Sequence, residues 1–281
     1  DLRGTLTGIE VLHYIESYKS IRGDFVNSEY FPQQFSRKNI TEEFRIGRDI
    51  DGISRATITS WAVARGVRDS ARKMAHSYLP DSDYVAATSG DAVALRVYED
   101  QNWNDMIESG LVKEMLVIQP DLTELHLSLA FIGHDGLGEL MLGIDDYSRA
   151  DRDASSRSRE GKMLLVGIDG NSSQPFRQER LAIKQGDELY PVERRRFVYA
   201  GSADAGKIKD RMRFAGAIVL MPELDLEEPF SILYSTEGVV GEFGGIHEMA
   251  YKVPELALAL SDGGPIAPEL IPLPENDAER F

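Results

Sequence analysis

One stretch constrains the fold of this chain more than any other: LTELHLSLAFIGHDGLGELMLGIDDY, residues 122–147. Apolar and polar residues alternate on both sides of His134-Asp135-Gly136-Leu137, and a period of two residues is typical of a strand with one covered face. The four residues between the two runs are typical of a hairpin loop. The sequence therefore predicts a β-hairpin over residues 122–146.

The register of this predicted hairpin places His126 opposite Asp145. A histidine beside an aspartate resembles the orienting half of a catalytic triad, and Asp169 is a further carboxylate that a two-acid hydrolase could use. No serine nucleophile accompanies them in the sequence, and a solvated cross-strand ion pair explains His126 and Asp145 more simply. We therefore assign no catalytic residue.

The second half of the chain carries several further apolar runs. Each is short enough for a strand and is bounded by polar or turn residues. The predicted strands are KMLLVGID at 162–169, ERLAIK at 179–184, RRFVYA at 195–200 and FAGAIVLM at 214–221. Together with helical patterns elsewhere, they indicate an α+β (mixed α/β) fold.

Composition excludes several classes of function. The 47 acidic residues outnumber the 31 lysines and arginines, giving a formal charge of -16, so broad attraction to a nucleic-acid backbone or to an anionic membrane is disfavoured, and nucleic acid is not expected as a direct ligand. The chain has no cysteine and five histidines without metal-ligand spacing, so no metal site is expected. The glycines near residue 240 have the spacing of neither a Walker A loop nor GxGxxG, so no cofactor is expected. No apolar run is long enough to span a membrane.

The N-terminal third contains three patterns. Residues 5–19 have apolar positions three apart and predict a short helix. Residues 40–50 have apolar residues on one parity and predict a strand that ends at Asp51-Gly52. Residues 54–79 carry a helical stripe that includes Trp61, although Thr57–Thr59 and Gly66 disfavour a helix. Periodicity favours a helix there.

Several short motifs are similar in order to those of the lambda-type major capsid proteins of tailed bacteriophages, whose fold is shared with encapsulins. They are EYFP at 29–32, ITEEFRI at 40–46, DG at 51–52, SWAVARGV at 60–67, SYLP at 77–80 and HEMAYKVPELALAL at 247–260. The resemblance implies that much of 54–79 is strand and extended loop instead of helix.

The resemblance implies a capsid fold in five parts. These are an N-terminal arm (1–35), an extended hairpin loop (36–85), a peripheral domain that includes the hairpin (86–150), an axial α/β domain (151–262) and a Pro-rich tail (263–281). It further implies a non-enzymatic, self-assembling shell protein, assembled in the host cytoplasm into the icosahedral capsid of a virion. Its partners would be copies of itself in pentamers and hexamers, with scaffold, portal and decoration proteins.

In that interpretation an apolar arm must bury its face on a neighbouring subunit. The expected assembly contacts are Phe31, Phe44, Ile46 and Trp61, and the expected inter-subunit ion pairs involve Arg194, Arg195 and Arg196. The alternative hypothesis is a soluble cytoplasmic α/β enzyme or ligand-binding module with a site near His126, Asp145 or Asp169.

Overall fold

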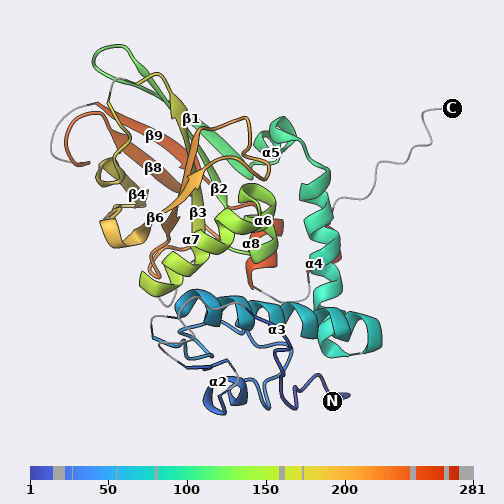
Figure 1. Ribbon diagram of the computed structural model, residues 1–281. Helices are drawn as coiled ribbons and strands as arrows, with labels where there is room; N and C mark the ends of the chain where they lie inside the picture. The colour runs from blue at the N-terminus through green and yellow to red at the C-terminus, as the bar shows by residue number, and fades with distance from the viewer. Residues whose placement is uncertain are drawn as a thin grey trace. The chain divides into compact units, whose positions relative to one another are not determined.

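The computed structural model divides the chain into two compact units, residues 1–89 and 90–281 (Figure 1). It describes residues 1–14, 23–26, 28–54, 56–79, 82–157, 162–172, 174–240, 245–262 and 266–271. Among these residues, no helix combines the length and the apolar character needed to cross a bilayer.

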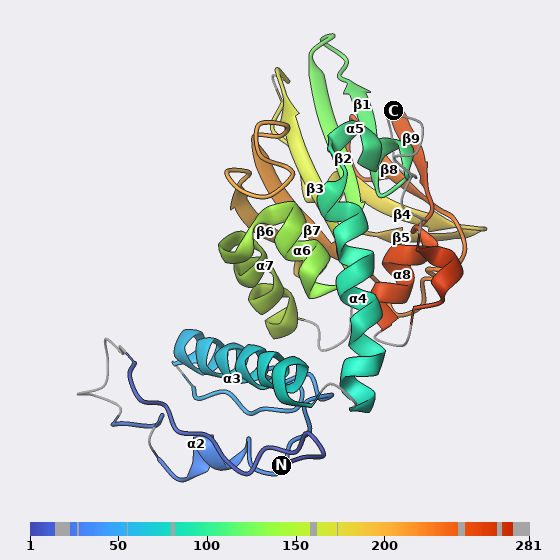
Figure 2. The ribbon, with the colours of Figure 1, turned by 90° about the vertical axis from the view of Figure 1, so that its right-hand side faces the viewer.

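The N-terminal unit is built around one long helix. It contains α2 (Tyr30–Gln33), α3 (Thr57–Tyr78) and the beginning of α4 (Asp83–Asp100), which continues into the second unit. Figure 2 shows α3 lying alongside the N-terminal segment and α2. Its core is aromatic, with Phe31 in edge-to-face contact with Phe25 and Phe35, at centroid distances of 5.7 and 5.6 Å. Such aromatic pairs add specific geometry to the apolar area that they bury.

The predicted helix over residues 5–19 is wrong for the residues described. Residues 5–14 form no helix: the Leu6 N–H donates to the Lys38 carbonyl and the Arg37 N–H donates to the Leu6 carbonyl, each at 2.8 Å. Residues 15–19 lie outside the described part of the chain. The backbone of this segment is therefore committed to pairing with a distant loop, which leaves it extended.

The predicted strand over residues 40–50 is also wrong, although its apolar residues do face inward. The carboxylate of Asp49 accepts from the Phe44 and Arg45 N–H groups at 2.9 and 2.6 Å, and Phe44 has φ +55°. These contacts close a tight loop in which Ile40, Phe44 and Ile50 are buried. Side-chain hydrogen bonds to the backbone compete here with a sheet ladder.

Helix α3 decides between the two interpretations of residues 54–79. Its 22 residues are helical from Thr57 to Tyr78, so the prediction from periodicity is confirmed. The extended loop implied by the capsid resemblance is wrong. The β-branched residues Thr57–Thr59 lie in the first turn of α3. Their lower helix propensity costs roughly a few tenths of a kcal/mol per residue.

The C-terminal unit contains two antiparallel sheets. The first has the order β1-β2-β3-β7-β6 and the second the order β5-β4-β8-β9. The strands are β1 (Val112–Ile118), β2 (Glu124–Phe131), β3 (Met163–Gly170), β4 (Leu181–Gln185), β5 (Glu188–Pro191), β6 (Phe197–Ser202), β7 (Phe214–Val219), β8 (Phe230–Ser235) and β9 (Ile246–Tyr251). This arrangement confirms the mixed α+β class and the four strands predicted in this half.

Helices and a large apolar core complete this unit. The helices are α5 (Trp103–Glu108), α6 (Asp135–Leu142), α7 (Ile144–Arg157) and α8 (Glu255–Asp262), with 3₁₀ turns at Gln178–Arg180, Arg194–Arg196 and Pro268–Leu270. Leu127 and Leu129 from the first sheet share the core with Ile232 and Tyr234 from the second. The buried faces of the two sheets therefore stabilise each other.

The predicted hairpin over 122–146 is half right. Its first strand is β2, but β2 pairs with β1 and β3, and the expected second strand is helix α6. The buried residues of α6 are Leu137, Gly138, Met141 and Leu142. Their spacing is that of a helix face, whereas the prediction considered only a period of two residues. The His134 side chain accepts from the Gly136 N–H at 3.1 Å, so the supposed turn is a helix cap.

Helix α5 provides a test of local stability. The Asn102 side chain accepts from the Asn104 and Asp105 N–H groups at 2.8 and 3.2 Å, and Asp105 accepts from the Asn102 N–H at 2.9 Å. We expect Asn102→Ala to lower the free energy of unfolding by about 1 kcal/mol, because this capping box is lost. Urea unfolding followed by Trp103 fluorescence, in a Trp61→Phe background, measures the change. Asn104→Ala keeps both capping side chains and should unfold like the parent.

Candidate functional site

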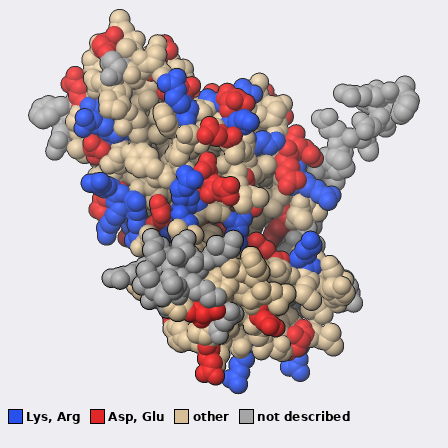
Figure 3. Space-filling model, in the orientation of Figure 1, with Lys and Arg blue, Asp and Glu red and all other residues tan. Residues whose placement is uncertain are grey.

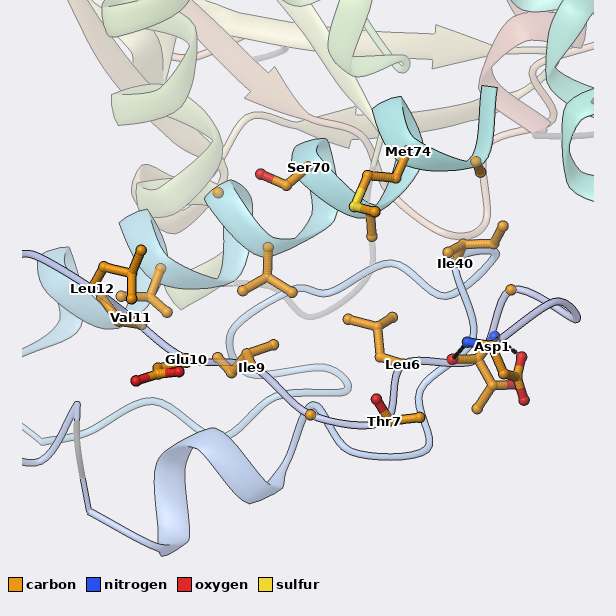
Figure 4. A pocket seen from close by; sticks show the side chains of 18 of the residues that line it. Asp1, Leu6, Thr7, Ile9, Glu10, Val11, Leu12, Ile40, Ser70 and Met74 are labelled. Carbon is orange, nitrogen blue, oxygen red and sulfur yellow. Dashed lines mark hydrogen bonds between the residues drawn. The ribbon is translucent and has the colours of Figure 1, made fainter. Parts of the chain in front are cut away.

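An open groove in the N-terminal unit runs between residues 1–14 and helix α3, and we call it the α3 groove (Figure 4). Its volume is about 1180 Å³. One side consists of Asp1, Leu2 and Gly4–Tyr14 of the N-terminal segment, together with Ile40 from a later loop. The other side consists of residues of α3 and the residue that follows it: Ile58, Thr59, Ala62, Val63, Gly66, Val67, Ser70, Ala71, Met74, Ala75, Tyr78 and Leu79. All of these residues belong to one unit, so the groove is complete within it.

The helix side of the groove has large residues at its ends and small ones in the middle. Ile58, Met74 and Tyr78 are 68, 61 and 75% exposed. Between them, at steps of four residues, lie Ala62, Gly66 and Ser70, and a Cβ added at Gly66 would meet nothing within 4 Å. Exposed apolar side chains flanking an open strip of helix are unusual on a protein surface and mark a binding surface.

The opposite side of the groove is the extended N-terminal segment. Leu6 and Ile9 are half-buried against the aromatic core of the unit and, as Figure 4 shows, lie between this segment and α3. The backbone hydrogen bonds to residues 37 and 38 hold the segment at this place. The groove is therefore preformed, with two apolar sides that face each other.

The N-terminal end of the groove is the first turn of α3. Its N-cap is Ala56, whose side chain cannot cap, and no acidic residue lies in the first turn. The Ser60 N–H donates to the Ala56 carbonyl at 3.0 Å. The helix dipole favours an anion at this end.

A second hollow, of about 540 Å³, lies in the C-terminal unit beside α5 and strands β1–β3. It brings together two of the three residues of the alternative hypothesis, because His126 pairs with Asp169 in the β2–β3 ladder. Asp145 instead lies in the first turn of α7 and does not line this hollow. The predicted His126–Asp145 pair is therefore wrong, since it depended on the hairpin that α6 replaces.

The residues expected at assembly contacts lie in the N-terminal unit. Phe31 and Phe44 are 0 and 2% exposed and belong to its aromatic core, with Ile46 packed against them. Trp61 is half-buried on α3 and does not line the groove. The burial of both phenylalanines is thus achieved within a single chain.

The three arginines expected in inter-subunit ion pairs form a short 3₁₀ turn, Arg194–Arg196. Arg195 pairs with Glu193 at 2.5 Å, and Arg196 donates to the Val219 and Leu220 carbonyls at 3.4 and 3.2 Å. Arg194 is exposed, and its carbonyl accepts from Arg157 at 3.3 Å. Figure 3 shows basic and acidic side chains interspersed on the visible face. Contacts of these arginines across subunits stay a prediction.

Residues 1–72 match the family model of the FMN-binding domain. Neither a curated protein nor a solved structure matches the chain. The family match covers the N-terminal segment and most of α3. It therefore contains one side of the α3 groove and most of the other, while Met74, Ala75, Tyr78 and Leu79 lie beyond it.

This match overturns the capsid interpretation. The resemblance to major capsid proteins is wrong, and so are the shell of self-associating subunits with its scaffold, portal and decoration partners and the virion location. Four of the six motifs that carried the resemblance lie within residues 1–72, which match an FMN-binding domain. A ligand-binding module, the alternative hypothesis, is favoured, but in the N-terminal unit. The sequence signal that could have indicated this site is the series of small residues at 62, 66 and 70 in a helical pattern.

Proposed function

We propose that the N-terminal unit binds FMN in the α3 groove. The observation that carries this proposal is the coincidence of the FMN-binding family match with a preformed apolar groove on the same residues. FMN combines a planar tricyclic ring, a ribityl chain and a phosphate. The groove offers a separate environment suited to each of these parts.

The ring fits the strip of helix around Gly66. A flat aromatic system needs a surface without protruding side chains, and the absent Cβ at Gly66 supplies it. Leu6 and Ile9 line the same groove from the N-terminal segment, so the ring would be held between two apolar surfaces. Burial of its faces would stabilise the complex by about 25 cal/mol per Å² of apolar area removed from water.

The phosphate fits the N-terminal turn of α3. Thr59 lines the groove there, and its position is seven residues from Gly66, about 10 Å along the helix at 1.5 Å per residue. A ribityl chain spans a distance of this order. The helix dipole would then stabilise the phosphate charge.

Bound FMN supplies one- and two-electron redox chemistry, while the chain binds and orients it. The apolar sides of the groove remove water from the faces of the ring, and the N-terminal segment covers it from one side. An electron carrier and a redox enzyme both use such a site. The expectation that this chain is not an enzyme therefore stays a prediction.

The test is to compare FMN with riboflavin, which lacks the phosphate. We expect saturable quenching of flavin fluorescence when the purified chain is titrated with FMN, and at least about tenfold weaker binding of riboflavin, because the contact at the α3 N-terminus is lost. Added salt should weaken FMN binding and leave riboflavin binding unchanged, since only the phosphate interaction is screened.

The chain purified from cells that supply FMN should also carry flavin absorption. Absence of both bound flavin and saturable titration would contradict the proposal. Equal affinity for FMN and riboflavin would be consistent with the proposed place of the ring and would contradict the proposed place of the phosphate.

A further inference from the structure

We propose that the Ser70 hydroxyl is the hydrogen-bond partner of the flavin N5 atom in the α3 groove, and that this contact fixes the orientation of the ring. The inference rests on the proposed binding of FMN and names a specificity-determining residue for it. Ser70 lies on α3, lines the groove and is exposed. It follows Gly66 by about one helical turn, about 6 Å along the axis.

The Ser70 hydroxyl differs in its hydrogen bonding from the other two serine hydroxyls of α3. The Ser60 hydroxyl donates to the Ala56 carbonyl at 3.0 Å, and the Ser77 hydroxyl donates to the Lys73 carbonyl at 3.1 Å. Bonds of this kind, to the carbonyl four residues earlier, are common for a serine inside a helix. Within the described part of the chain, the Ser70 hydroxyl makes no hydrogen bond. It is therefore available to a ligand in the groove.

The Ser70 side chain points along the helix toward the place proposed for the ring. Figure 4 shows its oxygen turned toward the beginning of α3. This direction is expected, because the Cα–Cβ bonds of a helix tilt toward its N-terminus. The turn on that side contains Gly66, where a Cβ would meet nothing within 4 Å. The hydroxyl therefore lies at the C-terminal border of the open strip of α3.

The connectivity of FMN decides which edge of the ring meets this hydroxyl. The ribityl chain leaves the ring at N10, and N5 lies opposite N10 in the central ring. With the phosphate at Thr59, the ribityl chain runs toward the beginning of α3, so the N5 edge faces the other way, toward Ser70. Thr59 and Ser70 are eleven residues apart, about 16 Å along the helix. An extended FMN and one hydrogen bond fill a span of this order.

A serine suits this position whether the flavin is oxidised or reduced. N5 of oxidised FMN accepts a hydrogen bond, whereas reduced FMN carries an N5–H that donates one. A hydroxyl can both donate and accept, so Ser70 can keep its contact in either state by rotating its O–H bond. An alanine at this position offers neither.

The test compares FMN with 5-deaza-FMN, in which a C–H group replaces N5 and cannot accept a hydrogen bond. We expect isothermal titration calorimetry of the flavin-free chain to show that FMN binds about three- to tenfold more tightly than 5-deaza-FMN. Ser70→Ala should weaken FMN binding by the same factor and leave 5-deaza-FMN binding unchanged. Ser70→Thr keeps a hydroxyl and should retain most of the preference for FMN.

Ser77→Ala is the matched control, because it removes a hydroxyl from the same helix at an exposed position that does not line the groove. It should change neither affinity. Equal binding of the two flavins by the parent chain, or an equal loss of both affinities in Ser70→Ala, would overturn the contact with N5 and leave FMN binding intact. A parent chain that binds neither flavin would instead contradict the proposed function, and this inference with it.

Discussion

Replacing Gly66 by leucine is expected to lower the affinity for FMN by about a hundredfold, close to 2.7 kcal/mol, while leaving the N-terminal unit folded. The leucine side chain would occupy the strip on which we place the flavin ring. The fold tolerates it, because the space around a Gly66 Cβ is open. Leucine is also the better helix former by about 0.8 kcal/mol, so the thermal midpoint should stay the same or rise.

The Gly66→Leu test is specific because FMN affinity is expected to fall while the thermal midpoint stays the same or rises. Lys73→Leu places the same side chain on α3 at an exposed position that does not line the groove, and should leave FMN affinity unchanged. Gly66→Ala should have a small effect, since one methyl group adds little height. Flavin fluorescence titration and thermal unfolding measure the two quantities. An unchanged FMN affinity of the Gly66→Leu variant would contradict the placement of the flavin ring at Gly66.

Helix α3 shows what the sequence could predict and why. Its apolar residues recur at helical spacing over 22 residues, long enough for periodicity to outweigh one glycine and three β-branched residues. The same holds for strands β3, β4, β6 and β7, whose short apolar runs are bounded by polar residues. These elements depend on local pattern, so a single sequence contains the information for them.

The region after β2 shows where local pattern is insufficient. Leu140, Leu142 and Ile144 are compatible with a strand face, while Leu137, Met141 and Leu142 are compatible with a helix face. The structure chooses the helix because Gly138 lets the Tyr147 ring pack on α6, where a Cβ would lie 2.0 Å from the ring. That contact depends on α7, and a two-residue period cannot reveal it.

The candidate site in the N-terminal unit depends on long-range pairing in a similar way. Its two sides come from residues 1–14 and from α3, about 45 residues later, and the first side is extended only because it pairs with residues 37–40. The polar hollow of the C-terminal unit likewise pairs His126 with Asp169 across strands 43 positions apart. The capsid resemblance was misleading because its motifs are loose patterns of residue type. Residues of one of these motifs, SWAVARGV at 60–67, line the α3 groove instead.

The largest expected effect on stability comes from Tyr251, whose hydroxyl joins two backbone groups in the core of the C-terminal unit. It accepts from the Phe131 N–H at 2.8 Å and donates to the Leu111 carbonyl at 2.9 Å. Burial raises the pKa of Tyr251 above its usual value, and it raises the pKa of nearby Tyr98 to about 12, so both remain neutral. The Tyr251 hydroxyl therefore links the last residue of β2, Phe131, to the residue before β1, Leu111.

Tyr251→Phe is expected to lower the free energy of unfolding by about 2–4 kcal/mol. The phenylalanine keeps the apolar contacts but leaves a buried N–H and a buried carbonyl without their partner, at a cost of about 1–3 kcal/mol each. Tyr199→Phe is the matched control, because Tyr199 is 58% exposed and donates to Gln178 at 3.2 Å; its change should stay within about 0.5 kcal/mol. Urea unfolding followed by Trp103 fluorescence in the Trp61→Phe background compares the two. Equal destabilisation by both would show that the Tyr251 hydroxyl contributes nothing specific, and that water replaces it at both backbone groups.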